Sequence, residues 1–137
     1  MATTSAIADR VTDAEIIQLL QTLIRAPTVN PPADTRACAE ALLACFQREG
    51  LDAELVENRP GMTNVVARLA GQRPGKHLLL NGHIDVVPPG DGWSVDPFSG
   101  DLRDNQVWGR GACDMKSGVA TLATALIALK RAGTPFA

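Results

Sequence analysis

The segment LLLNGHIDVVP, residues Leu78–Pro88, constrains the fold of this chain more than any other. Its apolar beginning is typical of a strand buried on both faces of a sheet, so we expect Lys76–Asn81 to form a central strand. Alternate side chains of an extended chain share a face, which places His83 and Asp85 on the same side. A carboxylate beside an imidazole fixes its tautomer and raises its basicity, as a metal-ligating histidine requires.

A histidine at the end of a strand is more often a hydrogen-bonded structural residue, so a second signal is needed. It comes from VWGRGACDMKSG, residues Val107–Gly118, where Asp114 stands just before a helical pattern. Loops held on a rigid scaffold are the usual carriers of catalytic groups. His83 and Asp114 are 31 positions apart and are joined by a Pro/Gly-rich loop and a hairpin, so a fold could bring the two side chains together.

These residues resemble the signature of a known enzyme family. The stretch from His83 to Gly118 is similar to the di-zinc peptidases and amidohydrolases related to acetylornithine deacetylase, succinyl-diaminopimelate desuccinylase, carboxypeptidase G and aminoacylase. LIRAPTVNPP, residues Leu23–Pro32, resembles the N-terminal helix and loop of that family. The resemblance implies that His83 is a zinc ligand, that Asp85 is the catalytic carboxylate orienting it, and that Asp114 bridges two zinc ions.

The chemistry of a two-metal site agrees with this assignment. Two metal ions roughly 3.5–4 Å apart need a bridging group, and an aspartate can offer one oxygen to each. Cobalt is a possible substitute for zinc. The resemblance further implies that the side chains of His83 and Asp114 converge within about 8 Å, with Asp85 in hydrogen-bond reach of His83. It also implies a cis peptide bond between Asp114 and Met115.

The resemblance also implies the architecture. Residues 1–137 are expected to form the N-terminal part of a catalytic zinc-hydrolase domain, an α/β fold with a mixed sheet flanked by helices, like that of zinc aminopeptidases. The chain is expected to be truncated, because it offers two metal ligands where a catalytic zinc normally takes three. The general base, the remaining ligands and the lid and dimerisation domain of the family are not found in it.

The expected function is zinc-dependent hydrolysis of the amide bond of an N-acyl amino acid or small peptide, carried out by the complete protein as a homodimer. The alternative is a non-catalytic fragment or binding module that keeps the fold and at most one weak metal site. Nucleotide binding is disfavoured, because Asp114 stands where the third glycine of a dinucleotide fingerprint would be.

Charge and composition exclude other classes of partner. The net charge of −2 gives no electrostatic basis for binding nucleic acid or an anionic membrane. No apolar run approaches the length of a membrane span. The three cysteines have no spacing typical of a disulfide framework or a metal knuckle, which indicates a cytoplasmic protein.

Local signals predict alternating helices and strands. Thr12 and Glu15 form a capping box that begins a helix ending before Pro27. A second helix begins at Asp34 or Thr35 and ends at Gly50. The remaining expected elements are strands at Ala53–Glu57 and Asn64–Leu69, a hairpin at Asp101–Trp108 turning at Asp104–Asn105, and a helix at Met115–Arg131.

Several side chains near the two signature segments keep two interpretations. Trp93 and Trp108 either line a substrate cleft or pack the hairpin on the sheet. Arg110 either contacts a substrate carboxylate or holds the loop through a hydrogen bond to Asp114. Lys116 is expected to be solvated, with the same carboxylate as the alternative, and Cys113 is expected to fill space beneath the loop. The remaining residues, Cys38, Cys45 and His77, are expected to be structural.

Overall fold

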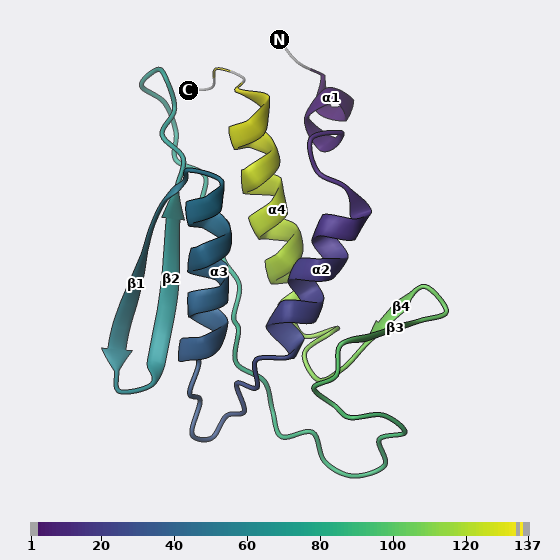
Figure 1. The fold of residues 1–137 in the computed structure, drawn as a ribbon. Coiled ribbons are helices and arrows are strands. Elements are labelled where there is room, and N and C mark those ends of the chain that lie inside the picture. The colour runs from purple at the N-terminus through teal and green to yellow at the C-terminus, as the bar shows by residue number, and fades with distance from the viewer. Residues whose placement is uncertain (1–2, 134, 136–137) are drawn as a thin grey trace.

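The computed structural model describes residues 3–133 and 135 (Figure 1). In chain order the elements are α1 (Thr4–Ala8), α2 (Asp13–Ile24), α3 (Arg36–Arg48), β1 (Asp52–Arg59), β2 (Met62–Arg68), β3 (Asp101–Arg103), β4 (Gln106–Trp108) and α4 (Lys116–Ala132). Helices α2, α3 and α4 lie side by side, and the β1–β2 hairpin lies beyond α3. The β3–β4 hairpin lies on the other side of the helices, near the C-terminal end of α2. The expected α/β class is confirmed.

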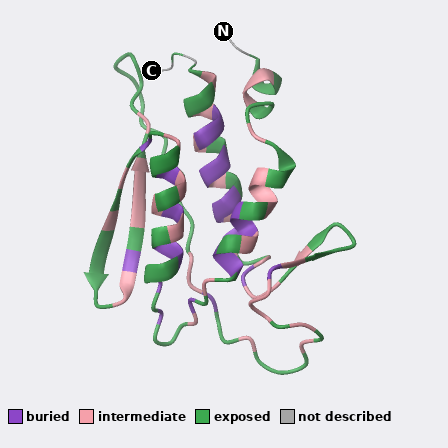
Figure 2. Cartoon of the chain, viewed as in Figure 1, coloured by how far each residue is buried: buried purple, intermediate pink, exposed green. Residues whose placement is uncertain are grey.

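The hydrophobic core lies where α2, α3 and α4 meet (Figure 2). Leu23 and Ile24 of α2 are completely buried, as are Cys38 of α3 and Ala120 of α4. Cys45 packs against the same core, so the structural interpretation of both α3 cysteines is confirmed. Each helix has one apolar stripe, and burying the three stripes against one another removes them from water.

The predicted helix ends are confirmed at α2 and α3. The Thr12 side chain accepts a hydrogen bond from the Glu15 amide, while the Glu15 carboxylate accepts from the Thr12 amide, which completes the capping box. Gly50 follows α3 with a φ of 66°, a left-handed conformation that residues with a Cβ atom disfavour. The next amide, of Leu51, then donates to the carbonyl of Phe46.

Both predicted hairpins form. β1 pairs antiparallel with β2, with Asp52 opposite Arg68, and this pair packs against α3. β3 pairs antiparallel with β4. Asp104 and Asn105 have φ values of 49° and 61°, and positive φ at both central residues is typical of the two-residue turn that matches strand twist.

The expected central strand is wrong as a buried, paired element. Lys76–Asn81 is extended, but within residues 3–133 no strand pairs with it. Leu78 is 81% exposed and Leu79 is 85% exposed. The sequence pattern describes a strand covered on both faces, whereas the described residues supply neither a hydrogen-bonded neighbour nor a covering layer for it. The one parallel pairing in this part of the chain is an isolated bridge between Val29 and Val86.

Helix α1 is an addition to the predicted elements. It has five residues, too few for an apolar stripe to be visible in the sequence, and the Thr3 side chain caps it by accepting from the Ala6 amide. Helix α1 contacts α4. In the described part of the chain, no helix combines the length and the apolar character needed to cross a membrane.

Candidate active site

The segment that carries His83 and Asp85 is held by the loop after α2. The Thr28 hydroxyl donates to the Ile84 carbonyl, and the Val86 amide donates to the Thr28 carbonyl at 3.0 Å. The Asn30 amide donates to the Val86 carbonyl at 2.8 Å. Ile84 packs against the core, as the alternation of the strand predicts. The two polar side chains are therefore fixed on the face opposite the core.

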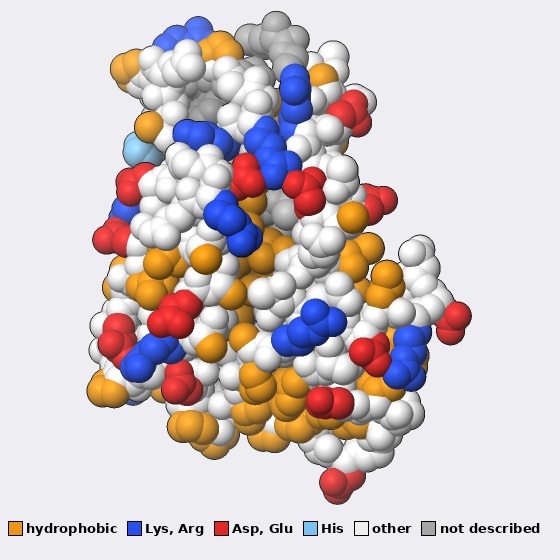
Figure 3. Space-filling view, in the orientation of Figure 1, with side chains coloured by type: hydrophobic (Ala, Val, Ile, Leu, Met, Phe, Trp, Pro, Cys, Tyr) orange, Lys and Arg blue, Asp and Glu red, His pale blue; other side chains and the backbone are white. Residues whose placement is uncertain are grey.

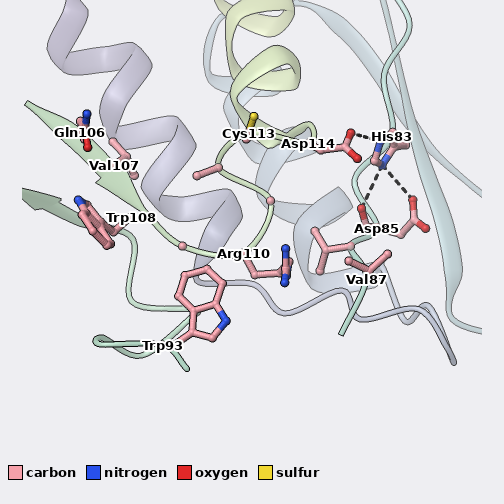
Figure 4. Close-up of a pocket in the computed structure, with 14 residues that line it drawn as sticks. His83, Asp85, Val87, Trp93, Gln106, Val107, Trp108, Arg110, Cys113 and Asp114 are labelled. Carbon is pink, nitrogen blue, oxygen red and sulfur yellow. Dashed lines mark hydrogen bonds and ion pairs between the residues drawn. The ribbon is translucent and has the colours of Figure 1, made fainter. Parts of the chain in front are cut away.

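His83 lies between two carboxylates (Figure 4). Its Nε2 is 3.0 Å from Asp114 Oδ1. Its Nδ1 is 3.0 Å from the Asp85 carbonyl oxygen and 3.2 Å from Asp85 Oδ1. The predicted convergence of these three side chains is confirmed as geometry, and their catalytic roles are taken up under Proposed function.

The two carboxylates favour a proton on His83. Partial burial works against the charged ring, but hydrogen bonds with Asp114 and with the backbone of Asp85, together with both carboxylate charges, raise the pKa of the imidazole. The ring nitrogen that faces Asp114 is also the one that would ligate a metal. A metal ion and a proton therefore compete for this position.

Asp114 lies at the point where the loop enters α4, with its side chain 86% exposed. The peptide bond from Asp114 to Met115 is cis, as the resemblance implies. The amide of Lys116 donates to the Gly111 carbonyl at 2.8 Å, which closes the turn that presents Asp114. Gly111 has a φ of 89°, and a Cβ there would lie 2.8 Å from Val86 Cγ1, so this turn requires glycine.

The expectation of a solvated Lys116 is wrong. The side chain is completely buried, and its Nζ donates to the carbonyls of Leu23 at 2.7 Å and Ala26 at 2.9 Å. The carbonyls at the C-terminal end of a helix lack the full set of partners within the helix, and the ammonium binds that of Leu23 in the last turn of α2 and that of Ala26 just beyond it. Burial lowers the pKa of this lysine.

A pocket of about 510 Å³ opens beside the two carboxylates. Its wall is largely apolar and includes Trp93 and Trp108, which favours the cleft interpretation of both tryptophans. Figure 3, in the orientation of Figure 1, shows hydrophobic side chains gathered on the lower part of the face that it presents. The full lining is His83, Asp85, Val86, Val87, Trp93, Gln106, Val107, Trp108, Gly109, Arg110, Gly111, Ala112, Cys113 and Asp114.

Two further expectations about the pocket are corrected. Arg110 does not bond Asp114: its Nη2 donates to the Pro89 carbonyl at 2.8 Å, and its guanidinium lies over the Trp93 ring at 5.5 Å. The Trp93 indole donates to the same carbonyl, so the three groups brace one another. Cys113 is exposed, because its side chain lies on the pocket side of the loop rather than beneath it. His77 is also exposed, and the structure shows no bond that would make it structural.

One residue near the site was not found from the sequence. Asn30 Nδ2 donates to Asp85 Oδ2 at 3.0 Å, from a position 55 residues earlier in the chain. The similarity of Leu23–Pro32 to the family's N-terminal loop marked this region, but it gave no role to the asparagine.

The donor chemistry of the site fits part of a zinc centre. An imidazole nitrogen and a carboxylate oxygen are two of the usual zinc ligands, and they converge here to 3.0 Å. Among the described residues no group of three or more His, Cys, Asp or Glu side chains is placed to hold a metal ion.

Comparison with known proteins agrees with this geometry. Residues 79–136 match the model of peptidase family M20/M25/M40. The chain is related to the M20/M25/M40 peptidases. The succinyl-diaminopimelate desuccinylase of Wolinella succinogenes is 42% identical over 111 residues, which make up 81% of this chain and 29% of that protein. The enzyme of that name from Granulibacter bethesdensis is 43% identical over 117 residues, which are 82% of this chain and 29% of that protein.

The resemblance predicted from the sequence is thus confirmed, and the M20 match includes His83, Asp85 and Asp114. A third relative, the desuccinylase of Gluconacetobacter diazotrophicus, is 41% identical over 121 residues, which are 85% of this chain and 30% of that protein. The chain spans about 30% of the length of these relatives. Most of each relative therefore has no counterpart in the chain.

Proposed function

We propose that this chain is the N-terminal part of the catalytic domain of a metal-dependent amidohydrolase that removes the acyl group from an N-acyl amino acid or small peptide. The observation that carries the proposal is the 3.0 Å approach of His83 Nε2 to Asp114 Oδ1, with Asp85 at the other ring nitrogen. The names of the relatives support a succinyl group as the acyl group.

In this proposal His83 and Asp114 would hold zinc, with cobalt as a substitute, and Asp114 would be the ligand shared by two ions, as the resemblance implies. When bound, such a pair lowers the pKa of a water molecule and polarises an amide carbonyl. Asp85 accepts the Nδ1 proton of His83, which keeps Nε2 free for the metal. The tryptophan-lined pocket beside Asp114 binds the apolar part of the substrate and excludes water from the scissile amide.

The remaining features of the proposal concern the whole protein. The other ligands and the general base come from outside residues 1–137, and the complete enzyme is a homodimer, as the resemblance implies. A cytoplasmic location is supported by Cys38, Cys45 and Cys113, all of which are free thiols. The substrate is a small molecule rather than a nucleic acid or a membrane.

A second candidate function is a non-catalytic module with one weak metal site. It is favoured by a specific observation: the described residues offer two metal donors at the site and no third. The two candidates differ in whether these side chains can support turnover when the missing ligands are supplied.

Metal titration of residues 1–137 provides the first test. We expect weak zinc binding, because two protein ligands leave each ion under-coordinated, and no hydrolysis of N-succinyl or N-acetyl amino acids. Isothermal titration with Zn²⁺ should show a site that His83→Ala removes and that His77→Ala, the matched histidine control, leaves unchanged. Equal affinity in the wild type and in His83→Ala would contradict the proposed site.

A chimera provides the second test. The N-terminal segment of the Wolinella succinogenes desuccinylase that aligns with this chain is replaced by residues of this chain, and the rest of that protein is retained. We expect zinc-dependent release of succinate, lost by more than about 100-fold in His83→Ala and in Asp114→Ala, because each removes a ligand. A folded chimera without turnover would favour the non-catalytic module.

A further inference from the structure

The loop after α2 controls the segment around Asp85 through its backbone. The hydrogen bonds from the Val86 amide to the Thr28 carbonyl and from the Asn30 amide to the Val86 carbonyl form the parallel bridge between Val29 and Val86. These bonds fix where the main chain of Asp85 lies. They leave the carboxylate free to turn, because backbone bonds fix neither the first side-chain torsion, which has several staggered positions, nor the terminal torsion, which has only a weak intrinsic preference.

The two oxygens of Asp85 have different partners. Oδ1 is 3.2 Å from His83 Nδ1, whereas Oδ2 accepts from Asn30 Nδ2 at 3.0 Å. A carboxylate with one oxygen bonded to each of two fixed groups has its plane defined by both. The Asn30 main chain is fixed by its own bond to Val86, so its side chain is anchored at the base.

We propose that Asn30 is a positioning residue that acts through Asp85: its side-chain amide orients the carboxylate that holds the His83 ring. This inference rests on the proposed function, in which Nε2 of His83 binds the metal. With the carboxylate fixed, the Nδ1 proton has a constant acceptor and the Nε2 lone pair has a constant direction. The amide can play this part because it donates, whereas a carboxylate at position 30 would repel Asp85.

A role in overall folding would have different consequences. Asn30 is exposed, so the loss of its amide removes one hydrogen bond at the surface. The backbone bonds of residues 28–30 do not depend on the side chain. The expected effect therefore lies in the ligand's orientation rather than in the stability of the chain.

The test is a double-mutant cycle on metal affinity. Zn²⁺ affinity is measured for Asn30→Ala, Asp85→Ala and the double variant, all in a Cys113→Ser background so that the exposed thiol cannot ligate the ion. We expect Asn30→Ala to weaken binding by about tenfold, the lower end of the effect of outer-shell partners, because the Asp85 carbonyl still accepts from the ring. In the Asp85→Ala background the same change should have less than a twofold effect.

Asn58→Ala, which removes an exposed asparagine from β1, is the matched control and should change nothing. Equal losses for Asn30→Ala in both backgrounds would overturn the inference, since Asn30 would then act independently of Asp85. Unchanged affinity in Asn30→Ala would overturn it as well.

A metal-free measurement separates this inference from the proposed function. Three-bond couplings between the Asp85 amide nitrogen and its carboxyl carbon report the first side-chain torsion, which aims the carboxylate at His83 and Asn30. We expect a single rotamer in the wild type and in Asn58→Ala, and averaged couplings in Asn30→Ala. If His83→Ala leaves zinc binding unchanged, the proposed metal site fails, and these couplings still decide the role of Asn30: unchanged couplings in Asn30→Ala overturn it.

Discussion

A fully buried ammonium group lies two residues beyond the proposed metal ligand Asp114. Lys116 donates to the carbonyl of Leu23, in the last turn of α2, and to that of Ala26, just beyond the helix. The same side chain contacts the loop under Gly111, where a Cβ would lie 3.1 Å from its Cδ. One residue thus joins the end of α2 to the turn that presents Asp114, and its loss would affect both the fold and the site.

We expect Lys116→Ala to lower the free energy of unfolding by about 3 kcal/mol, because it opens a cavity, leaves the Ala26 carbonyl without its donor, and leaves the Leu23 carbonyl with only the 3.4 Å bond from the Ala26 amide. Lys116→Met keeps most of the volume and should cost about 2 kcal/mol. Urea unfolding followed by circular dichroism gives both values. Lys130→Ala, at an exposed position of the same helix, is the control and should change stability by less than about 0.5 kcal/mol. A similar small effect for Lys116→Ala would contradict the bonding described here.

The residues of the site differ in how far the sequence could reveal them. His83, Asp85 and Asp114 stand out because each lies in a short segment whose pattern is itself typical of a metal site. The partners of Lys116 lie up to 93 residues away, and those of Arg110 lie 21 residues away in an irregular loop. No local pattern encodes such contacts, which is why the expectation of a solvated Lys116 and the expected bond from Arg110 to Asp114 were wrong.

At the scale of the elements, three helices meet at one arginine. Arg131 of α4 forms a two-point ion pair with Glu49 at the end of α3, at 2.7 and 2.9 Å, and a third bond with Glu15 of α2 at 2.7 Å. Glu15 also completes the capping box of α2. The cluster therefore couples the first turn of one helix to the last turns of two others.

This cluster predicts how stability depends on pH. The pKa of Glu15 is lowered by the Thr12 amide and by Arg131, and the pKa of Glu49 is lowered by its bond to Arg131. A carboxyl group with a lower pKa in the folded state contributes stability above its unfolded pKa of about 4.3, and this contribution is lost as pH falls through the folded value.

We therefore expect Arg131→Gln to lower the free energy of unfolding at pH 7 by less than about 1 kcal/mol, because the ion pairs are partly exposed. The melting temperature at pH 7 should fall only slightly. Between about pH 5 and pH 3 the melting temperature should fall less steeply in Arg131→Gln than in the wild type. Arg59→Gln, which removes an exposed arginine of β1 that has no ion pair among the described residues, should keep the wild-type slope. Parallel curves for the wild type and Arg131→Gln would contradict this role of the cluster.

The elements themselves were largely predictable, because each has a local cause. The capping box begins α2, Gly50 ends α3, and Asp104–Asn105 turns the β3–β4 hairpin. The segment Lys76–Asn81 shows the limit of such signals. Its leucines describe the environment of a central strand, and that environment depends on partners that no local pattern can supply.

At the scale of the whole molecule, the chain has a helical core and an uncovered, extended apolar segment, Lys76–Asn81. Leu78 and Leu79 are more than 80% exposed, and the described residues provide no strand to pair with their backbone. The aligned regions of the desuccinylases cover about 30% of their length, so the relatives have many residues that this chain lacks. An extended, apolar and unpaired segment is a template for pairing with another chain.

We expect residues 1–137 in isolation to self-associate through this extended segment, because pairing with the same segment of a second chain would hydrogen-bond its free backbone and bury Leu78 and Leu79. Sedimentation equilibrium should show a mass that rises with protein concentration. The double variant Leu78→Lys/Leu79→Lys should remain monomeric over the same range, since two charges oppose burial at the edge. Leu102→Lys changes a leucine of β3 that is 48% exposed but lies in a paired strand, and it should associate like the wild type. If Leu102→Lys abolishes association and the double variant does not, the interface lies on the β3–β4 hairpin instead.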